Sequence, residues 1–347
     1  MLDFYSIECI FLEAQSRYEA CHCVAVFHKQ QQSDPGKEHE NVYLESSRWE
    51  STLNALHELD TLVTEQANLV GDLQSAITRI LGEPSKSEKL DKSLPTIFAI
   101  TPTFARPAQK AELTRLVQTF LHVPNFHWIL VEDSQTKTKL VTNFLAENTI
   151  VHTHLNALTP PNHKLGKNDP AWKQARGVQQ RNAALRWIRE ELSDVGNGIV
   201  YFADDDNTYS VKLFKEMSKI KKVGVWPVGL VGGMMVERPI CDNATNKVTG
   251  FNAVWKPNRV FPVDMAGFAV HIDLIREKKD VWFSYETEGG YQETVFLEQL
   301  ATRDDLEPLA DACTKVYVWH TRTEPPLLNA EQRLMRKGKK SNEGIEV

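Results

Sequence analysis

The sequence predicts an α/β fold with a doubly wound mixed sheet. Short runs of β-branched and other apolar residues alternate with amphipathic helical stretches between about residues 94 and 223. These apolar runs are continuous, which is typical of strands buried on both faces. Several of the runs also end directly in polar or acidic residues, and ligands bind at the carboxyl ends of the strands in open α/β sheets.

Each element has a local signal. Strands are expected at residues 97–100, 128–131, 150–154 and 199–203. Helices are expected between them at residues 107–121, 137–147 and 177–192, and Pro107 in the first turn of the first helix fits the tolerance for proline at that position. After Val223 the pattern becomes strand-rich and is interrupted by glycines. The second half is therefore expected to hold mixed sheet and long loops.

The segment before this domain has a different pattern. Residues 1–48 show no clear period and are interpreted as a loosely structured leader. Residues 49–93 are interpreted as a helical stem and linker, because apolar residues recur there with heptad spacing, namely Leu56, Leu59, Val63, Val70, Leu73, Ile77 and Ile80. The heptads predict a coiled coil that forms a parallel homodimer, which deletion of residues 1–84 is expected to weaken. The alternative is a single amphipathic helix docked on the body of the protein.

The composition limits the class of protein. Apolar residues make up 41% and charged residues 25% of the 347 residues, which excludes wholesale disorder. The net charge of −6 disfavours a nucleic-acid binder, which usually carries a basic excess. No stretch approaches the roughly 18 apolar residues of a membrane span. Glycine-rich dinucleotide and P-loop motifs are absent from the sequence.

The cysteines and one sequon give weaker signals. Five cysteines are scattered along the chain and are interpreted as unpaired. Cys21 and Cys23 are too close in sequence for a zinc knuckle. Asn243, in Asn-Ala-Thr, is a candidate glycosylation site if the chain enters the secretory pathway.

The strongest chemical signal is the acidic triplet Asp204, Asp205 and Asp206, which directly follows an apolar strand. Three adjacent carboxylates repel one another, and a divalent cation such as Mn²⁺ or Mg²⁺ removes that cost. Such ions keep open positions for substrate phosphates. The alternative is a solvated acidic turn in which Asp206 or Asn207 caps the next helix.

Cationic side chains form the second group. Arg176 and Arg181 flank the expected start of a helix, and Arg322 follows His320 in Trp-His-Thr-Arg. Arginine forks and a helix N-terminus both suit a diphosphate. For each arginine the alternative is a solvated surface position, and for His320 it is a hydrogen-bonded core histidine.

The glycine-rich half carries further candidates. Glu293 follows Gly289-Gly-Tyr-Gln, where the glycines would let the backbone approach a ligand and the carboxylate would serve as a general base. The alternative is a glutamate that stabilises the first turn of a helix. Trp255 would stack on a sugar, and carboxylates such as Glu237 and Asp264 would accept hydrogen bonds from hydroxyl groups, although each alone is more often structural.

Taken together and in order, these segments resemble the animal β-1,3-glucuronosyltransferases of glycosyltransferase family 43. The resemblance covers about residues 94–347, and it rests on residues 101–106, 109–115, 120–125, 127–133, 176–182, 201–210, 226–228, 263–268, 318–324 and 345–347. It implies a GT-A type nucleotide-sugar-binding fold and a catalytic domain over residues 94–347. The implied reaction is an inverting transfer of glucuronic acid from UDP-glucuronate to a galactose-terminated glycan.

The resemblance also implies roles for single residues. It implies a catalytic base at Glu293 and a direct Mn²⁺ ligand at Asp206. Donor contacts are implied at Thr103, Phe104, Asp133, Arg176, Arg181, Asp204, Asp205, Asp206, His320 and Arg322. Acceptor contacts are implied at Glu237, Trp255, Arg259 and Asp264. Phe104 stands where the family commonly has a tyrosine beside the uracil, so stacking is expected to remain without the hydroxyl contact.

The acceptor and the location stay open at this point. Residues 250–255 and 262–264 are similar to the members that act on the Gal-β1,3-Gal-β1,4-Xyl linkage region, whereas residues 289–293 are similar to those that extend N-acetyllactosamine to the HNK-1 precursor. A non-catalytic binding protein that dimerises through the stem is an alternative from another class, and a metal-dependent nuclease or phosphatase is a more distant one. The resemblance implies a Golgi type II membrane protein. Because residues 1–48 contain no anchor, they are interpreted as a variant or incomplete N-terminus.

Overall fold

The computed structural model describes residues 52, 54–66, 69, 91, 93–164, 166, 174–193, 195–242 and 244–347. The chain divides into two compact units, residues 1–85 and residues 86–347. In the first unit, residues 54–66 form a helix on which Leu56, Leu59 and Val63 are exposed. The helical state of this part of the stem is confirmed. The leader and the heptad positions from Val70 onward lie outside the described residues, so the coiled coil stays a prediction.

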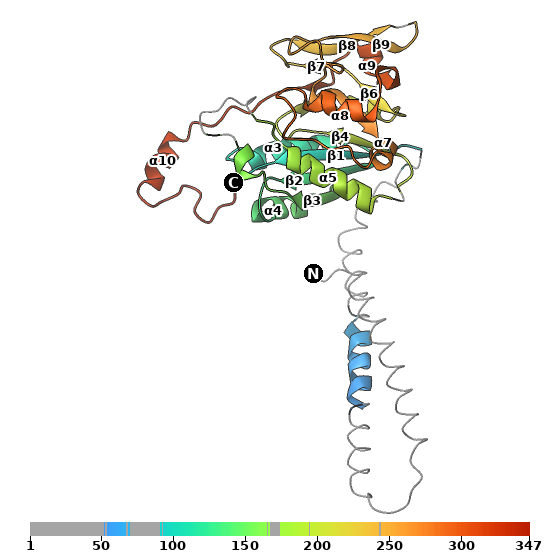
Figure 1. Ribbon diagram of the computed structural model, residues 1–347. Coiled ribbons are helices and arrows are strands. Elements are labelled where there is room, and N and C mark those ends of the chain that lie inside the picture. The colour runs from blue at the N-terminus through green and yellow to red at the C-terminus, as the bar shows by residue number, and fades with distance from the viewer. Residues whose placement is uncertain are drawn as a thin grey trace, which may run out of the picture. The chain divides into compact units, whose positions relative to one another are not determined.

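A seven-stranded mixed sheet forms the centre of the second unit (Figure 1). Its order is β11 (Leu306–Pro308), β6 (Val223–Val225), β10 (Phe268–His271), β4 (Gly198–Phe202), β1 (Thr96–Thr103), β2 (Phe126–Glu132) and β3 (His152–Asn156). All neighbours pair in parallel except β10, which is antiparallel to both β4 and β6. The predicted doubly wound mixed sheet is confirmed.

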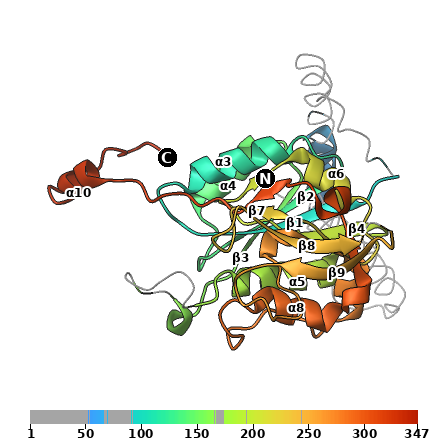
Figure 2. The ribbon, with the colours of Figure 1, turned by 90° about the horizontal axis from the view of Figure 1, so that it is seen from above.

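Helices cover both faces of this sheet, as Figure 2 shows for α3 and α4 on one side and for α5 and α8 on the other. The helices α3 (Gln109–Phe120), α4 (Lys139–Glu147) and α6 (Val211–Met217) enclose a core with Phe120, Trp128 and Phe214. The helices α5 (Val178–Glu191), α7 (Ile272–Glu277) and α8 (Gln292–Leu300) enclose a second core with Phe202 and Phe296. Because the strands are apolar on both faces, both cores are sealed from water.

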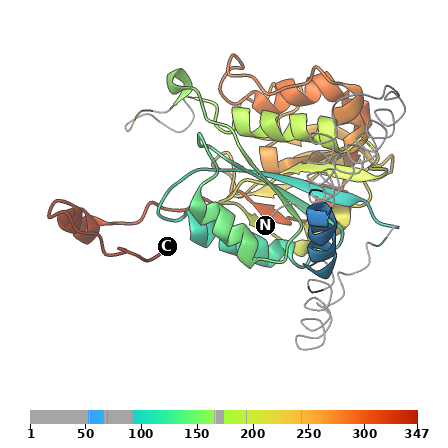
Figure 3. The same cartoon turned by 90° about the horizontal axis from the view of Figure 1, so that it is seen from below.

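The second half of the chain adds a five-stranded sheet. Its order is β5 (Thr208–Tyr209), β12 (Val318–Trp319), β7 (Val228–Gly229), β8 (Val236–Asp242) and β9 (Lys247–Asn252). The short helical turns η2 (Met265–Gly267), η3 (Arg303–Asp305) and α9 (Ala310–Cys313) lie in this half of the chain, whereas η1 (Pro161–His163) lies between β3 and α5. Figure 3 shows the C-terminal segment with α10 (Asn329–Met335) extending away from the sheets. This half holds the mixed sheet and long loops that the glycine pattern predicted.

The boundaries differ from the sequence-based expectations for local reasons. The first helix begins at Gln109 rather than at residue 107, because the Gln109 amide donates to Arg106 O in a turn that includes Pro107. The second helix begins after Thr138, whose hydroxyl caps it. The proposal that Asp206 or Asn207 caps the next helix is wrong: β5 intervenes, and Ser210 caps α6.

Across the described part of the chain, no helix has the length and apolar character needed to span a bilayer.

Candidate active site

The carboxyl ends of β1 and β2 carry the first two predicted site residues. The Asp133 amide donates to Thr103 O over 2.7 Å, which joins the two strand ends. The Asp133 carboxylate accepts hydrogen bonds from the Thr159 amide at 2.7 Å and from the Thr159 hydroxyl at 2.8 Å. Thr103 is buried, and the next residue, Phe104, is 49% exposed with its ring available for stacking. The structure therefore places Thr103, Phe104 and Asp133 together at one edge of the sheet.

The acidic triplet follows β4, and its three carboxylates have different partners. Asp204 forms an ion pair with Arg181 at 2.7 Å, and Asp205 forms one with Arg106 at 2.7 Å. Within the described residues, no hydrogen bond or ion pair reaches the carboxylate of Asp206. Burial raises the pKa of Asp206, and the negative charges of Asp204 and Asp205 raise it further. A cation beside Asp206 would oppose this rise and favour the ionised carboxylate.

A divalent metal fits this position by the chemistry of its donors. No group of three or more metal-ligating side chains occurs among the residues that the structure describes. Mg²⁺-like ions are commonly held by one or two carboxylates while water and substrate phosphates fill the other positions. Asp206, the one member of the triplet without a cationic partner, is the residue that would hold such an ion.

Arg106 was missed as a site residue by the sequence analysis, although it lies in one of the segments that carry the resemblance. Its guanidinium pairs with both Asp205 and Glu112, and it stacks over the Phe104 ring at 4.5 Å from the ring centre. The sequence did contain a signal for this role of Arg106. Adjacent carboxylates at a strand end favour nearby cations, and Arg106 follows β1, the parallel neighbour of β4.

Arg181 is held in place at the start of α5. One of its nitrogens donates to Arg176 O at 2.8 Å, and another donates to Asp204 at 2.7 Å. Gly177 caps the helix with a φ of +73°, and a Cβ there would lie 2.7 Å from Arg181 Nη1. Arg176 itself is exposed. Arg176 and Arg181 lie at the start of α5, as predicted. The guanidinium of Arg181 forms an ion pair with Asp204.

Replacing Gly177 by alanine should displace Arg181. We expect the free energy of unfolding to fall by about 1–2 kcal/mol, because alanine is strained in the left-handed region. Weaker UDP binding is expected as well, because Asp204 loses its partner. Gly196→Ala is the control, since that glycine has open space around its Cβ position. Chemical denaturation and calorimetry measure both effects, and equal results for the two variants would contradict this role.

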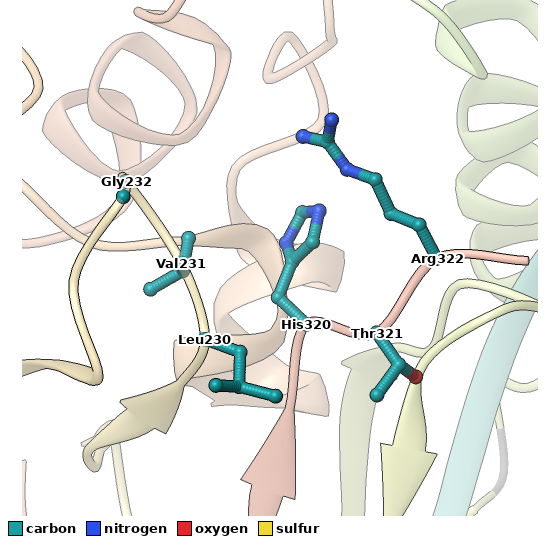
Figure 4. Close-up of a pocket in the computed structure, with 7 residues that line it drawn as sticks. Leu230, Val231, Gly232, His320, Thr321 and Arg322 are labelled. Carbon is teal, nitrogen blue, oxygen red and sulfur yellow. The ribbon is translucent and has the colours of Figure 1, made fainter. Parts of the chain in front are cut away.

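His320 and Arg322 line a cavity of about 540 Å³ together with Leu230, Val231, Gly232, Gly233 and Thr321. Figure 4 shows the imidazole of His320 and the guanidinium of Arg322 on the same side of the strand exit, opposite the loop of Val231 and Gly232. Thr321 points the other way and donates to Asp206 O at 2.7 Å. This contact ties the cavity to the acidic triplet.

Asp264 fixes the orientation of His320. The Nδ1 atom of His320 lies 2.9 Å from Asp264 Oδ2, and this hydrogen bond raises the pKa of His320. The other oxygen of Asp264 accepts a hydrogen bond from the Ala266 amide at 2.9 Å. The hydrogen bond with Asp264 therefore stabilises the protonated imidazole relative to the neutral one. His320 is hydrogen-bonded, as the alternative expected, but it is only partly buried and lines the cavity, so its predicted contact with a diphosphate stays a prediction.

Replacing Asp264 by asparagine should lower the pKa of His320. The hydrogen bond with the carboxylate is the largest cause that raises this pKa, and a neutral amide cannot supply it. NMR titration of the imidazole measures the change. Asp273→Asn, an exposed position on α7, serves as the control. An unshifted titration in Asp264→Asn would show that another group sets the charge of His320.

Glu293 lies in the first turn of α8, as expected for a glutamate that stabilises a helix start. It also lies near the charged side chains of Arg259 and Asp264. Burial raises its pKa to about 7, and Asp264 adds to the rise, while Arg259 opposes it. Its carboxylate lies 3.8 Å from a nitrogen of Arg259. A carboxyl group with a pKa near neutrality is suited to take and release protons.

Arg259 and Trp255 lie beside the turn that precedes Glu293, and Glu237 lies against the loop of Gly232. Buried Arg259 donates to Gly290 O at 2.6 Å, directly before the helix that carries Glu293. The Trp255 indole covers Gly290, where a Cβ would lie 2.2 Å from its nitrogen, and 46% of Trp255 remains exposed. Glu237 is buried and packs against Gly232. A Cβ at that glycine would lie 2.1 Å from a carboxylate oxygen of Glu237.

Asp264 links the two groups of residues. Its carboxylate bonds His320, and its charge raises the pKa of both Glu293 and Glu237. The charge of His320 in turn opposes the rise in the pKa of Asp206. Asp206, His320, Asp264, Glu237 and Glu293 therefore influence one another within one polar region. Asn243 lies outside the described residues. The fold and this region place the chain among α/β enzymes that bind nucleotide-type ligands at strand ends.

The chain belongs to glycosyltransferase family 43, whose model matches residues 116–324. It is 54% identical over 259 residues to galactosylgalactosylxylosylprotein 3-beta-glucuronosyltransferase I of Drosophila melanogaster, covering 74% of this chain and 85% of that protein. It is 51% identical over 279 residues to the enzyme sqv-8 of Caenorhabditis elegans, covering 79% and 78%. It is 46% identical over 288 residues to galactosylgalactosylxylosylprotein 3-beta-glucuronosyltransferase 3 of Mus musculus, covering 80% and 85%.

Family membership confirms the resemblance drawn from the sequence motifs. A glycosyltransferase moves a sugar from an activated donor to an acceptor, so the site must hold both molecules at once. The acidic triplet with the His320 cavity forms one half of the polar region, and the surroundings of Glu293 form the other. The separation of these residues into donor-side and acceptor-side groups stays a prediction, and Asp264 contacts both groups.

Proposed function

We propose that the protein transfers glucuronic acid from UDP-glucuronate, with inversion, to the 3-hydroxyl of a terminal galactose on the Gal-β1,3-Gal-β1,4-Xyl linkage region of proteoglycans. The names of the relatives support the donor sugar and the acceptor, at identities of 46–54%. The observation that carries the chemistry is Glu293, a carboxyl group with a pKa of about 7 beside the exposed Trp255 region.

Glu293 acts on the acceptor. Inversion requires a single in-line displacement, in which a base takes the proton of the attacking hydroxyl while the leaving group departs on the opposite side. The ionised Glu293 accepts that proton, and Arg259 at 3.8 Å stabilises its charged form before the reaction. Trp255 offers an exposed indole face on which a galactose ring stacks, while Glu237 and Asp264 accept hydrogen bonds from sugar hydroxyls.

The other half of the site stabilises the departing UDP. Arg322 is exposed on the cavity, and His320 carries a raised pKa, so both offer positive charge to a diphosphate. Arg181 neutralises Asp204 and thereby supports the triplet rather than contacting the diphosphate with all its donors. Bound at Asp206, Mn²⁺ would supply Lewis-acid stabilisation of the leaving group. Phe104 stacks on the uracil ring, and Asp133 and Arg176 complete the donor contacts.

The location and assembly follow the family resemblance. We infer a Golgi setting, in agreement with the glycan-synthesising relatives, and a homodimer formed through the stem helix. Leu56, Leu59 and Val63 are exposed on that helix, and burying an apolar seam of this kind is what a coiled coil achieves.

An acceptor panel tests the function. The purified chain is incubated with UDP-glucuronate, Mn²⁺ and either Gal-β1,3-Gal-β1,4-Xyl or N-acetyllactosamine, and the product linkage is determined by NMR. The expected result is β-1,3 transfer that favours the linkage trisaccharide. Preference for N-acetyllactosamine would reassign the acceptor, and absence of transfer to any terminal galactoside would refute the proposed reaction. Hydrolysis of phosphate esters without sugar transfer would point to a different enzyme class.

A further inference from the structure

Two cysteines that are far apart in the sequence meet in the structure. Cys241 lies near the end of β8, next to a bulge in its pairing with β9, and Cys313 is the last residue of α9. The pKa of each thiol is shifted chiefly by the other thiol. The thiol of Cys313 also lies 3.8 Å from Val225 O. Both thiols are free in the structure, and Cys313 is completely buried while Cys241 is half-buried.

A second contact holds the two segments side by side. The Arg238 guanidinium, from β8, donates to Cys313 O over 3.3 Å. Figure 1 shows α9 next to β8 and β9. The α9 turn is unusual because its four residues have φ values of +55°, +57°, +47° and +62°. Each L-residue in this left-handed region is strained, so the turn needs support from its surroundings.

We propose that Cys241 and Cys313 form a disulfide that fastens the left-handed turn of α9 to strand β8. Arg238, three residues before Cys241 on β8, bonds the carbonyl of Cys313 and so holds the two segments together. Each thiol is also the main cause of the pKa shift of the other, so the side chains are close and the bond needs only a small approach. The sequence analysis interpreted the cysteines as unpaired, because nothing in their spacing indicates this meeting.

The reaction needs a disulfide donor, and glutathione disulfide is one of the right chemical class. Cys241 is the more accessible thiol, and the hydrogen bond from Cys313 lowers its pKa, as does Arg238. Its thiolate attacks glutathione disulfide, giving a mixed disulfide and one glutathione. The Cys313 thiolate then attacks the Cys241 sulfur and releases the second glutathione. The protein dithiol is oxidised by two electrons, glutathione disulfide is reduced, and the two protons leave with the two glutathione thiols.

The second step is feasible although the pKa of Cys313 is raised. The hydrogen bond with Cys241 is the largest cause of that rise, and burial and the charge of Cys241 add to it. Once Cys241 is in a mixed disulfide it has no negative charge, so part of the rise disappears. The pair is independent of the transfer chemistry, because neither sulfur belongs to the donor or acceptor residues. Oxidising secretory compartments favour such a bond.

The test uses the full chain. The protein is equilibrated in glutathione buffers from fully reducing to fully oxidising, blocked with N-ethylmaleimide, digested without reductant and analysed by mass spectrometry. The expected product is a peptide pair linked through Cys241 and Cys313, in the wild type and in a Cys9→Ser, Cys21→Ser, Cys23→Ser variant. Complete N-ethylmaleimide labelling of both cysteines under oxidising conditions would overturn the proposal, and so would a stable glutathione adduct on Cys241 alone.

Thermal unfolding provides a second measurement that does not depend on peptide recovery. Reductant is expected to lower the Tm of the oxidised wild type by about 10 °C, since the bond would close a long loop in the unfolded chain. The Cys241→Ser variant should be insensitive to reductant, because Cys313 then has no partner. Equal sensitivity of both proteins would show that this pair is not the reducible element.

Discussion

Replacing Glu293 by glutamine is expected to lower kcat by about 10²–10⁴-fold while UDP binding stays unchanged. Glutamine keeps the size and hydrogen-bonding shape of the side chain but cannot accept the proton of the acceptor hydroxyl. Steady-state kinetics and calorimetry with UDP measure the two properties separately. Glu298→Gln is the matched control, because Glu298 is exposed on the same helix. Near-full activity of Glu293→Gln would show that another group acts as the base.

The same residue predicts the pH dependence. The pKa of Glu293 is about 7, raised above that of an ordinary glutamate by burial, and only the ionised form is a base. As the pH falls below about 7 the protonated fraction grows, so kcat/KM of the wild type should drop about tenfold per pH unit. Above about pH 7, kcat/KM should stop rising with pH. A profile without an acidic limb between pH 5 and 7 would contradict the assignment.

Replacing Asp206 by asparagine should reduce kcat/KM by about 10²–10³-fold and should remove the Mn²⁺ dependence of UDP binding. Asp204 and Asp205 already have arginine partners, so neither can substitute for Asp206 without breaking an ion pair. Folding should be preserved or improved, since the substitution removes a partly buried charge that Asp204 and Asp205 repel.

Calorimetric titration of UDP with and without Mn²⁺ distinguishes a metal ligand from a merely structural carboxylate. Asp304→Asn is the control, because the Asp304 side chain is 87% exposed. If Asp206→Asn bound UDP with the same Mn²⁺ dependence as the wild type, the metal would have to lie elsewhere.

Local patterns were enough for the central elements of the sheet. The strands that became β1, β2 and β4 are apolar on both faces, and this property can be recognised from a few neighbouring residues. The acidic triplet could be placed at a strand end for the same reason, because an apolar run leads directly into it. Boundaries were less predictable: β3 runs over His152–Asn156, since its pairing with β2 sets its ends.

The division of charges among partners could not be predicted from the sequence. Arg106 and Asp205 lie 99 positions apart, yet they pair because β1 and β4 are parallel neighbours. The link from Asp264 to His320 likewise depends on η2 and β12 being packed together. The raised pKa of Glu293 follows from burial beside Asp264, which no local pattern reports.

The sequence by itself determined the fold class, the strand-end site and the family resemblance, because each rests on short segments whose residue types are informative alone. Only the tertiary structure decided which carboxylate of the triplet lacks a cation, how Asp264 connects the two halves of the site, and that Cys241 meets Cys313. These are contacts between distant segments. Their free energies depend on distance, burial and neighbouring charge, which arise only when the sheets and helices pack.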